Sequence, residues 1–243
     1  MERRKVVTLI AAATASIAVN NSFAQFGGLK NLSKGLTDDS SSSENSASGG
    51  PSSWGEAAAM FKVAKSEFTS AVGDLANISA DIADALDLKS EAALLRSEAT
   101  KLREKGDAMG TADLDAVARN SDSTNVLIEE KLKSADALSA DQKAALGDAA
   151  VEYVPLIITN ISIAKKLKDT VAGISSLGKP GFRDGVAAVS AAKDIPQLGP
   201  KMIEFSVDAI TTGQSLVSLM SSKGVATPAT DDLDAEFDAF MAA

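Results

Sequence analysis

Apolar side chains recur every seven residues along the first half of this sequence. The large row is Phe61, Phe68, Leu75 and Ile82, and the small row is Ala57, Ala64, Ala71, Ile78 and Ala85. The rows are offset by alternating steps of four and three residues, which keeps both on one face of an α-helix. We therefore expect a helix that packs lengthwise against another helix, with the small row allowing the backbones to approach closely.

The pattern continues in a different phase after Ile82. Its large row is Leu88, Leu95, Leu102 and Met109, and its small row is Ala92, Ala99 and Gly106. The change of phase indicates either a turn around residues 84–89 or one long helix with a phase slip. We favour the turn, because a long helix with a single apolar stripe needs a partner. Residues 54–105 are therefore predicted to form a long heptad-patterned antiparallel hairpin at the N-terminal side of the fold.

Composition extends this expectation to the whole folded part. Alanine, which favours helices and disfavours strands, is abundant, whereas aromatic residues make up only 4% of the chain. The chain has no cysteine, so packing alone must stabilise it. We predict an all-α protein, a helical bundle of about five or six helices, with residues 54–224 as its single domain.

The middle of the chain carries two further helical patterns. The first covers residues 112–137, where the polar stretch 121–125 introduces a break as the alternative to one continuous helix. The second begins at Ser139 and Gln142, which form a capping box, and ends near Leu177 before a Gly-Lys-Pro-Gly stop.

The last core segment is expected to contain two helices separated by a turn. A short helix covers residues 182–193, and Pro196 and Pro200 bracket the turn. The final helix runs from Pro200, which suits the first turn of a helix, to Lys223.

The first 24 residues are predicted to be a secretory signal peptide. Basic residues at positions 3–5 precede the uncharged apolar run Val6–Val19, and the small residues Ser22 and Ala24 stand at the positions that signal peptidase reads. The run of about 14 residues is shorter than the roughly 20 that span a bilayer, so cleavage after Ala24 is favoured over a membrane anchor. We therefore expect export to the periplasm, with the extracellular space as the alternative.

Two terminal segments flank the predicted bundle. Residues 25–53 combine a short apolar and basic motif with a flexible Ser-rich linker, and residues 225–243 combine a linker with an acidic amphipathic tail. The candidate docking residues are Phe26, Leu29, Leu32 and Leu36 in the first segment and Leu233, Phe237, Phe240 and Met241 in the second. We hypothesise that at least one motif lies as a helix in a groove of a partner or of a second copy. The alternative is an end that frays or packs on its own core.

Residues 151–164 form the most apolar stretch that follows the predicted signal peptide. The candidate membrane-active residues within it are Tyr153, Pro155, Ile157, Ile158 and Ile161. A central buried helix accounts for the same stretch, because buried helices are often apolar on all sides. We favour the buried helix, since the run is too short to span a bilayer as it stands, and Pro155 predicts a kink in it.

The sequence lacks the residues on which most enzymatic sites depend. It contains no His and no Cys, which excludes Ser-His-Asp and Cys-His catalytic arrangements and zinc sites built from those residues. No Gly-rich phosphate-binding motif is present. Asp232, Asp234 and Glu236 alternate like the start of a calcium loop, but Phe237 occupies the position that needs Gly. We therefore expect no enzyme activity, no cofactor and no metal site.

The remaining functions are those that act by contact. The net charge of −9 argues against nucleic-acid binding, which needs clustered Lys and Arg. We expect a non-enzymatic exported interaction protein, a scaffold, adaptor or accessory subunit of the cell envelope, that binds an unidentified envelope protein or itself. The alternatives are a membrane-active helical protein, with membrane contact the less favoured reading, and a carrier of an apolar ligand in the bundle core.

Overall fold

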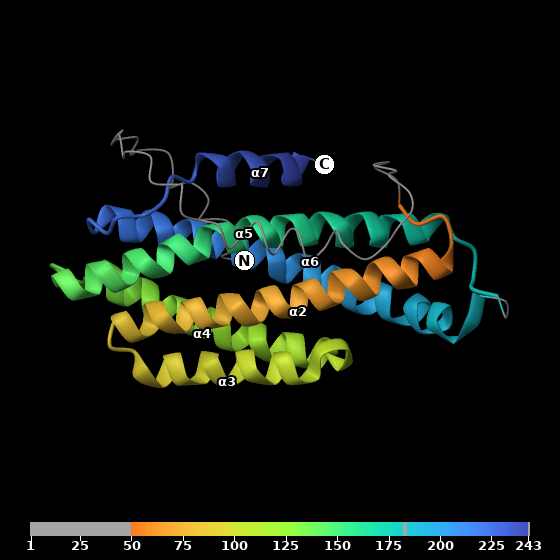
Figure 1. Ribbon diagram of the computed structural model, residues 1–243, viewed down its shortest axis with the longest axis horizontal. Helices are drawn as coiled ribbons and strands as arrows, with labels where there is room; N and C mark the ends of the chain where they lie inside the picture. The colour runs from red at the N-terminus through yellow and green to blue at the C-terminus, as the bar shows by residue number, and fades with distance from the viewer. Residues whose placement is uncertain (1–49, 182–183, 243) are drawn as a thin grey trace, which may run out of the picture. The chain divides into compact units, whose positions relative to one another are not determined.

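The computed structural model describes residues 50–181 and 184–242, and helices account for most of this part. In chain order they are α2 (Trp54–Ala85), α3 (Lys89–Lys105), α4 (Thr111–Ser134), α5 (Ala140–Gly173), α6 (Gly185–Ser222) and α7 (Asp231–Ala242) (Figure 1). No strand occurs among the described residues, so the predicted all-α class is confirmed. The predicted signal peptide and the candidate residues Phe26, Leu29, Leu32 and Leu36 lie outside the described residues.

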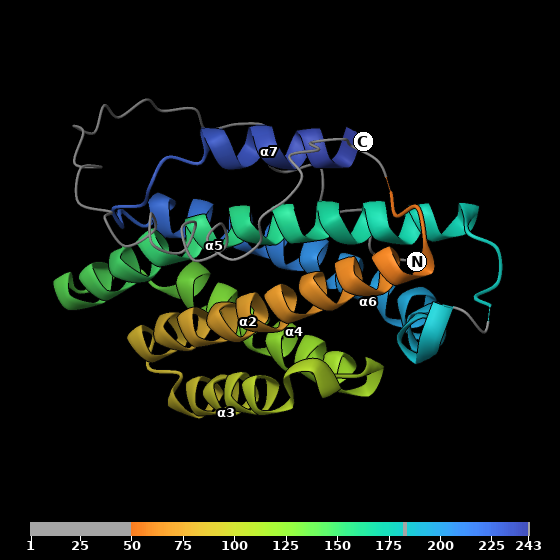
Figure 2. The same cartoon turned by 45° about the vertical axis from the view of Figure 1, so that its right-hand side comes forward.

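Helix α5 lies at the centre of the bundle. It contacts α2, α6 and α7, and α2 also contacts α3 and α6. Helix α4 packs against α6 and α3. Both views in Figures 1 and 2 show α7 lying along α5, at the side of the bundle away from α3. The arrangement gives α5 two kinds of neighbour, the long helices of the bundle and the short C-terminal helix.

The seven-residue rows of α2 lie inside the structure. Every member of the two rows is buried except Ala85, which is half-buried. The rows serve two apolar clusters, because Phe68 packs in a cluster with Leu198 of α6, whereas Ile82 packs in a cluster with Leu146 of α5. The α2 rows are therefore covered by several helices and not by α3 alone.

A turn separates α2 from α3. Helix α2 ends at Ala85 and α3 begins at Lys89, within the region where the sequence phase changes. Asp87 in this turn has a φ of 61°, the left-handed region that Asp tolerates better than most residues.

Helix α4 is continuous through the polar stretch 121–125, so the alternative of a break there is wrong. The stretch keeps the helical phase of the apolar residues around it. Thr124 lies seven residues after Val117 and is buried like it, while the polar residues between them lie toward solvent. A buried threonine therefore fills a core position that the sequence pattern left unassigned.

The predicted turn between Pro196 and Pro200 is also wrong, because α6 runs through both prolines as one helix. Each proline removes one backbone donor and leaves the carbonyl four residues earlier without its helical partner. Both prolines are exposed, so water can hydrate those carbonyls, while Ile195 and Leu198 on the opposite side are buried. Packing of the buried side therefore keeps the helix intact across a local break signal.

The capping box at the start of α5 is confirmed. The backbone N–H of Gln142 donates to the Ser139 Oγ at 3.1 Å, and the backbone N–H of Ser139 donates to the Gln142 Oε1 at 3.0 Å. The helix ends at Gly173 and continues as the short 3₁₀ turn Ile174–Ser176, close to the predicted end at Leu177.

Candidate docking site

Helix α7 carries its apolar face toward α5. Leu233 is fully buried and Phe240 is 3% exposed, and both belong to the same apolar cluster as the core residues of α5. Phe237 is partly buried against this cluster, whereas Met241 is 59% exposed. Three of the four candidate residues in the tail therefore pack on the chain's own bundle, and the fourth faces solvent.

Polar contacts fix the position of α7 along α5. The Lys165 Nζ lies 2.8 Å from the Glu236 Oε2, and the Lys168 Nζ lies 5.4 Å from the centre of the Phe240 ring. Residue numbers rise together in these two pairs, so α7 and α5 run parallel, as Figure 2 also shows. The sequence reasoning missed these lysines as partners, although the opposite charges of residues 165–168 and 231–238 were a usable signal.

A third polar contact comes from α6. The Gln214 Nε2 donates to the Asp234 Oδ1 at 2.8 Å. Asp234 and Glu236, which alternate like calcium ligands in the sequence, are therefore each engaged by a side chain of the bundle. Among the described residues no group of three or more Asp or Glu side chains is arranged to hold a metal ion.

The tether before α7 is anchored at its start. Gly224 has a φ of 75°, a conformation that favours glycine, and ends α6. Val225 is only 4% exposed, and its backbone N–H donates to the Met220 carbonyl at 3.1 Å. Residues 226–230 then lead to Asp231 without a buried side chain. The anchor at Val225 fixes the end of α6 independently of α7.

The candidate membrane-active residues lie on two sides of α5. Tyr153, Ile157 and Ile161 are buried, whereas Pro155 and Ile158 are half-buried. Helix α5 is extended by its 3₁₀ turn to residues 140–176, which is long and apolar enough to cross a membrane by length and composition, and half of its most apolar window is buried in the bundle. The stretch that the sequence identified therefore lies in a helix that is apolar on its partly exposed side as well as on its buried side.

The side of α5 toward α6 is packed at backbone distance. A Cβ placed on Gly213 of α6 would overlap the Ile157 Cδ1 and lie 2.8 Å from the Tyr153 Cε1. Burial raises the pKa of the Tyr153 phenol to about 12, and this effect is larger than the lowering by the hydrogen bond with Ser79 of α2. Tyr153 is therefore neutral at physiological pH and acts as a core residue.

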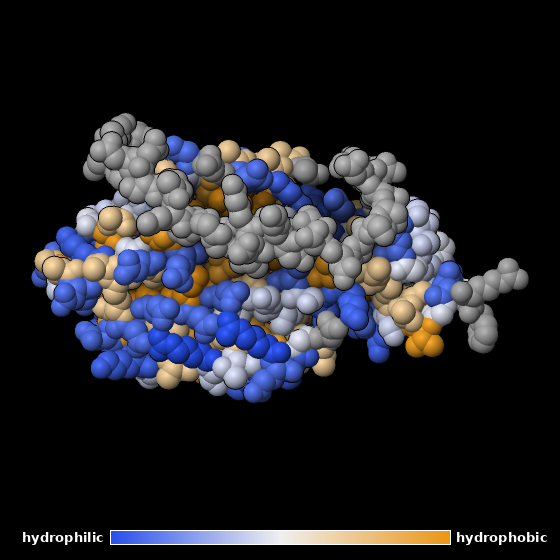
Figure 3. All heavy atoms as spheres, in the orientation of Figure 1, coloured by the Kyte–Doolittle hydropathy of each residue, from blue (hydrophilic) through white to orange (hydrophobic). Residues whose placement is uncertain are grey.

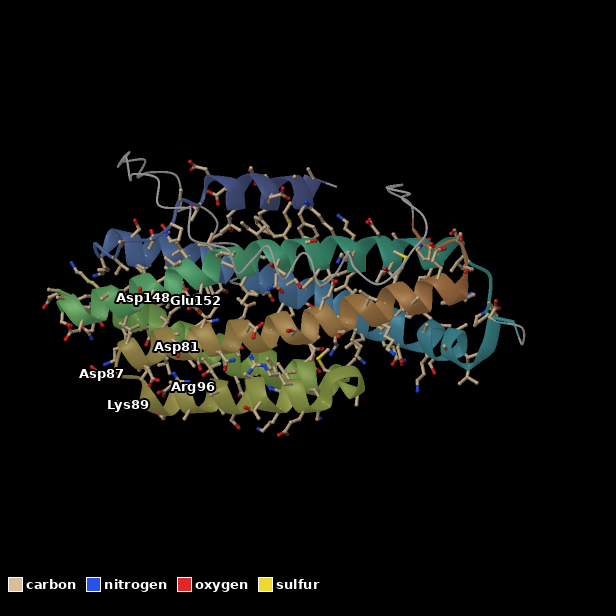
Figure 4. All side chains as sticks on the ribbon, viewed as in Figure 1. Asp81, Asp87, Lys89, Arg96, Asp148 and Glu152 are labelled. Atoms are coloured by element: carbon tan, nitrogen blue, oxygen red, sulfur yellow. The ribbon has the colours of Figure 1, made fainter. Side chains whose placement is uncertain are left out.

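Arg96 of α3 pairs with two of the acidic residues at one end of the bundle. Figure 4 labels Asp81 of α2, Arg96 of α3 and, on the neighbouring end of α5, Asp148 and Glu152. The Arg96 guanidinium lies 2.7 Å from Asp81 and 2.6 Å from Asp84, and these hydrogen bonds raise the pKa of Arg96. The arrangement is that of exposed ion pairs between helices.

A surface hollow of about 630 Å³ lies where α4 meets the start of α3. Its lining residues are Leu88, Leu127, Glu130, Lys131, Lys133 and Ser134. The hollow is open to solvent, whereas a carrier of apolar ligands encloses most of the ligand surface.

Comparisons of the chain with protein-family models, with curated proteins and with solved structures found no match. No relative therefore supplies an activity or a site residue. The contacts between α5 and α7 remain the arrangement on which a function can be argued.

Proposed function

We propose that this chain is a non-enzymatic exported interaction protein, a scaffold, adaptor or accessory subunit of the cell envelope, that acts through helix faces and its terminal motifs. The observation that carries the proposal is the separate docking of α7 on α5. Its partner is an envelope protein or a second copy of the chain.

The small size of α7 supports this role. A 12-residue helix is marginal in isolation, so α7 depends on its contacts with the bundle for its order. Those contacts comprise two well-buried side chains, Leu233 and Phe240, and exposed polar pairs that contribute little each. Segments with few buried contacts open at lower free energy than the core does. Helix α7 is therefore the part of the bundle best suited to exchange partners.

In this proposal, residues 54–105 form a heptad-patterned antiparallel hairpin that supports α5. Arg96 pairs with Asp81, and Arg103 pairs with Asp74 at 2.6 Å. Both the arginines and the aspartates are seven residues apart, and their numbers run in opposite directions, as an antiparallel heptad register requires. The lower part of Figure 3, over α3, is largely hydrophilic, which suits the outer arm of such a support.

The proposal is tested by deleting residues 231–243 from the mature chain. We expect the deletion to change the oligomeric mass measured by sedimentation, or the set of envelope proteins that the mature chain captures. Val126→Ala is the control, because Val126 is an exposed apolar residue of α4 and lies outside both terminal motifs. Identical mass and identical capture for the deletion and the intact chain would contradict the proposal.

A membrane-active function is the second candidate, and the length and apolar character of α5 favour it. In this function α5 leaves the bundle and enters a bilayer, with Lys165 and Lys168 at the headgroups. Release of a trapped dye from phosphatidylcholine–phosphatidylglycerol vesicles by the mature chain is the expected result. Intact vesicles in the presence of folded protein would contradict the membrane-active function.

A further inference from the structure

Two isoleucines and two lysines are regularly spaced along the part of α5 that α7 covers. Ile158, Ile161, Lys165 and Lys168 are spaced by three, four and three residues, so they form one stripe along the helix, here named the α5 stripe. Ile161 belongs to the apolar cluster that holds Leu233 and Phe240, and the half-buried Ile158 packs against this cluster. Its two lysines contact Glu236 and Phe240. The α5 stripe is thus apolar in its first half and basic in its second.

Helix α7 is the chemical complement of this stripe. Leu233 and Phe240 are seven residues apart, two helical turns, and both are buried. Glu236 lies one turn after Leu233, where its carboxylate reaches the Lys165 ammonium. The acidic first turn of α7 also suits the N-terminal end of a helix dipole. An apolar face with a carboxylate between its two anchors is therefore what the α5 stripe recognises.

The tether permits α7 to leave without disturbing the bundle. Val225 is buried and fixes the end of α6, whereas residues 226–230 carry no buried side chain. Lys165 and Glu236 have side chains that are 40% and 52% exposed, so a competing group can reach this pair from solvent. The α5 stripe is therefore covered by a helix that is anchored at Leu233 and Phe240 and is accessible to solvent at its ion pair.

We propose that the α5 stripe binds acidic amphipathic helices supplied by a partner, and that α7 is the resident helix that such a partner displaces. The inference rests on the proposed interaction function and deepens it by naming the kind of partner. A helix is favoured over a lipid surface because the observed occupant is a helix, held by two apolar anchors and a matched carboxylate–ammonium pair. Helix-in-groove recognition uses the same spacing of anchors.

The test uses the full chain and a fluorescent peptide of residues 229–243. In one full-length variant, Leu233→Ser and Phe240→Ser together release the resident helix and open the α5 stripe. We expect this variant to bind the peptide at least about tenfold more tightly than the unchanged chain, because the resident α7 competes at a high effective concentration. Circular dichroism and thermal unfolding confirm that the variant keeps the bundle.

A charge exchange tests the recognition itself. In the opened variant, Lys165→Glu is expected to weaken binding of the unchanged peptide about fivefold, and a peptide carrying Glu236→Lys is expected to restore it. A merely apolar or non-specific association would not follow this reversal. Lys201→Glu is the matched control, since Lys201 pairs with Asp115 of α4, away from the stripe.

The outcomes separate this inference from the function above it. Absence of peptide binding to the opened variant, or equal binding by the opened and unchanged chains, overturns the α5 stripe as a helix site. Binding of the opened variant to anionic phosphatidylglycerol vesicles but not to the peptide overturns it in favour of a lipid surface. Deletion of residues 231–243, followed by oligomeric mass and capture, tests the interaction function separately. A partner can bind α7 itself without using the α5 stripe.

Discussion

The two sides of α5 differ in how they are covered. Toward α6, Ile157 and Tyr153 pack against Gly213 so closely that a single added carbon would collide with them. Toward α7, Ile158 is half-buried and the covering helix is held by a few anchors and exposed polar pairs. One helix therefore combines a face that fixes the fold with a face whose cover can be exchanged, and the difference lies in the neighbour more than in the hydrophobicity of α5.

The largest expected effect comes from truncating adjacent isoleucines. Ile157→Ala should lower the free energy of unfolding by about 4 kcal/mol, because it removes a fully buried side chain and leaves a cavity. Ile158→Ala, one residue away, should lower it by only about 1 kcal/mol, since this side chain is half-buried. Urea denaturation measures both. Equal losses would show that the two faces of α5 are equally important to the fold.

Overfilling the closer face gives the next effect. Gly213→Val should destabilise the protein by about 3 kcal/mol, because the new side chain must displace Ile157 and Tyr153. Gly55→Val is the control, since Gly55 lies in α2 with only the Ser53 Oγ near its added carbon, and its stability should change by less than about 0.5 kcal/mol. Thermal unfolding compares the two variants, and a tolerated Gly213→Val would refute the close approach of α5 and α6.

The burial of Tyr153 predicts a pH effect on the same face. Its folded pKa of about 12 lies above the unfolded value near 10, so the folded state holds the proton more tightly. The contribution is complete below pH 10 and declines as the pH rises toward 12, reaching a loss of about 1.4 kcal/mol at pH 11. Tyr153→Phe should lack this loss, measured as the change in unfolding free energy between pH 9 and pH 11. The same alkaline decline in both proteins would place Tyr153 in a solvated environment.

The smallest effect concerns the exchangeable face. A double-mutant cycle on Lys165→Ala and Glu236→Ala should give a coupling of about 0.5 kcal/mol, as exposed ion pairs do. Hydrogen exchange of the α7 amides is the readout, because α7 can open without global unfolding. The pair Lys166–Glu67, which joins α5 to α2 at 2.8 Å, is the matched comparison. Loss of the Lys166–Glu67 pair should leave hydrogen exchange in α7 unchanged. Faster exchange in α7 would show that the contacts of α5 with α2 and with α7 are energetically coupled.

Several local features were predictable because their cause is local. The seven-residue rows place Phe68 and Ile82 in the core, and the capping box places the start of α5 at Ser139. The spacing of the apolar residues in the tail predicts a helix over residues 231–243, and α7 covers Asp231–Ala242. Each of these follows from helix geometry and backbone hydrogen bonding over a few residues.

Other features were beyond local reasoning. Pro196 and Pro200 are strong break signals, yet the buried residues on the opposite side hold α6 together. Thr124 is polar and still occupies a core position in α4. In the candidate site, Leu233 and Phe240 were identified by their spacing. The contacts of Lys165 with Glu236 and of Gln214 with Asp234 were not predicted. These depend on which helices meet, and that depends on contacts distant in sequence.

The sequence by itself determined the all-α class, the amphipathic character of α2 and α7 and the strongly apolar character of α5, because helical periodicity and capping are encoded within a few turns. Only the tertiary structure decided which side of α5 is fixed and which is exchangeable. Ile157 and Ile158 are the same residue type in adjacent positions, so nothing local separates them. The physical difference is the covering neighbour, which is the close backbone of α6 at Gly213 on one side and a short tethered helix on the other.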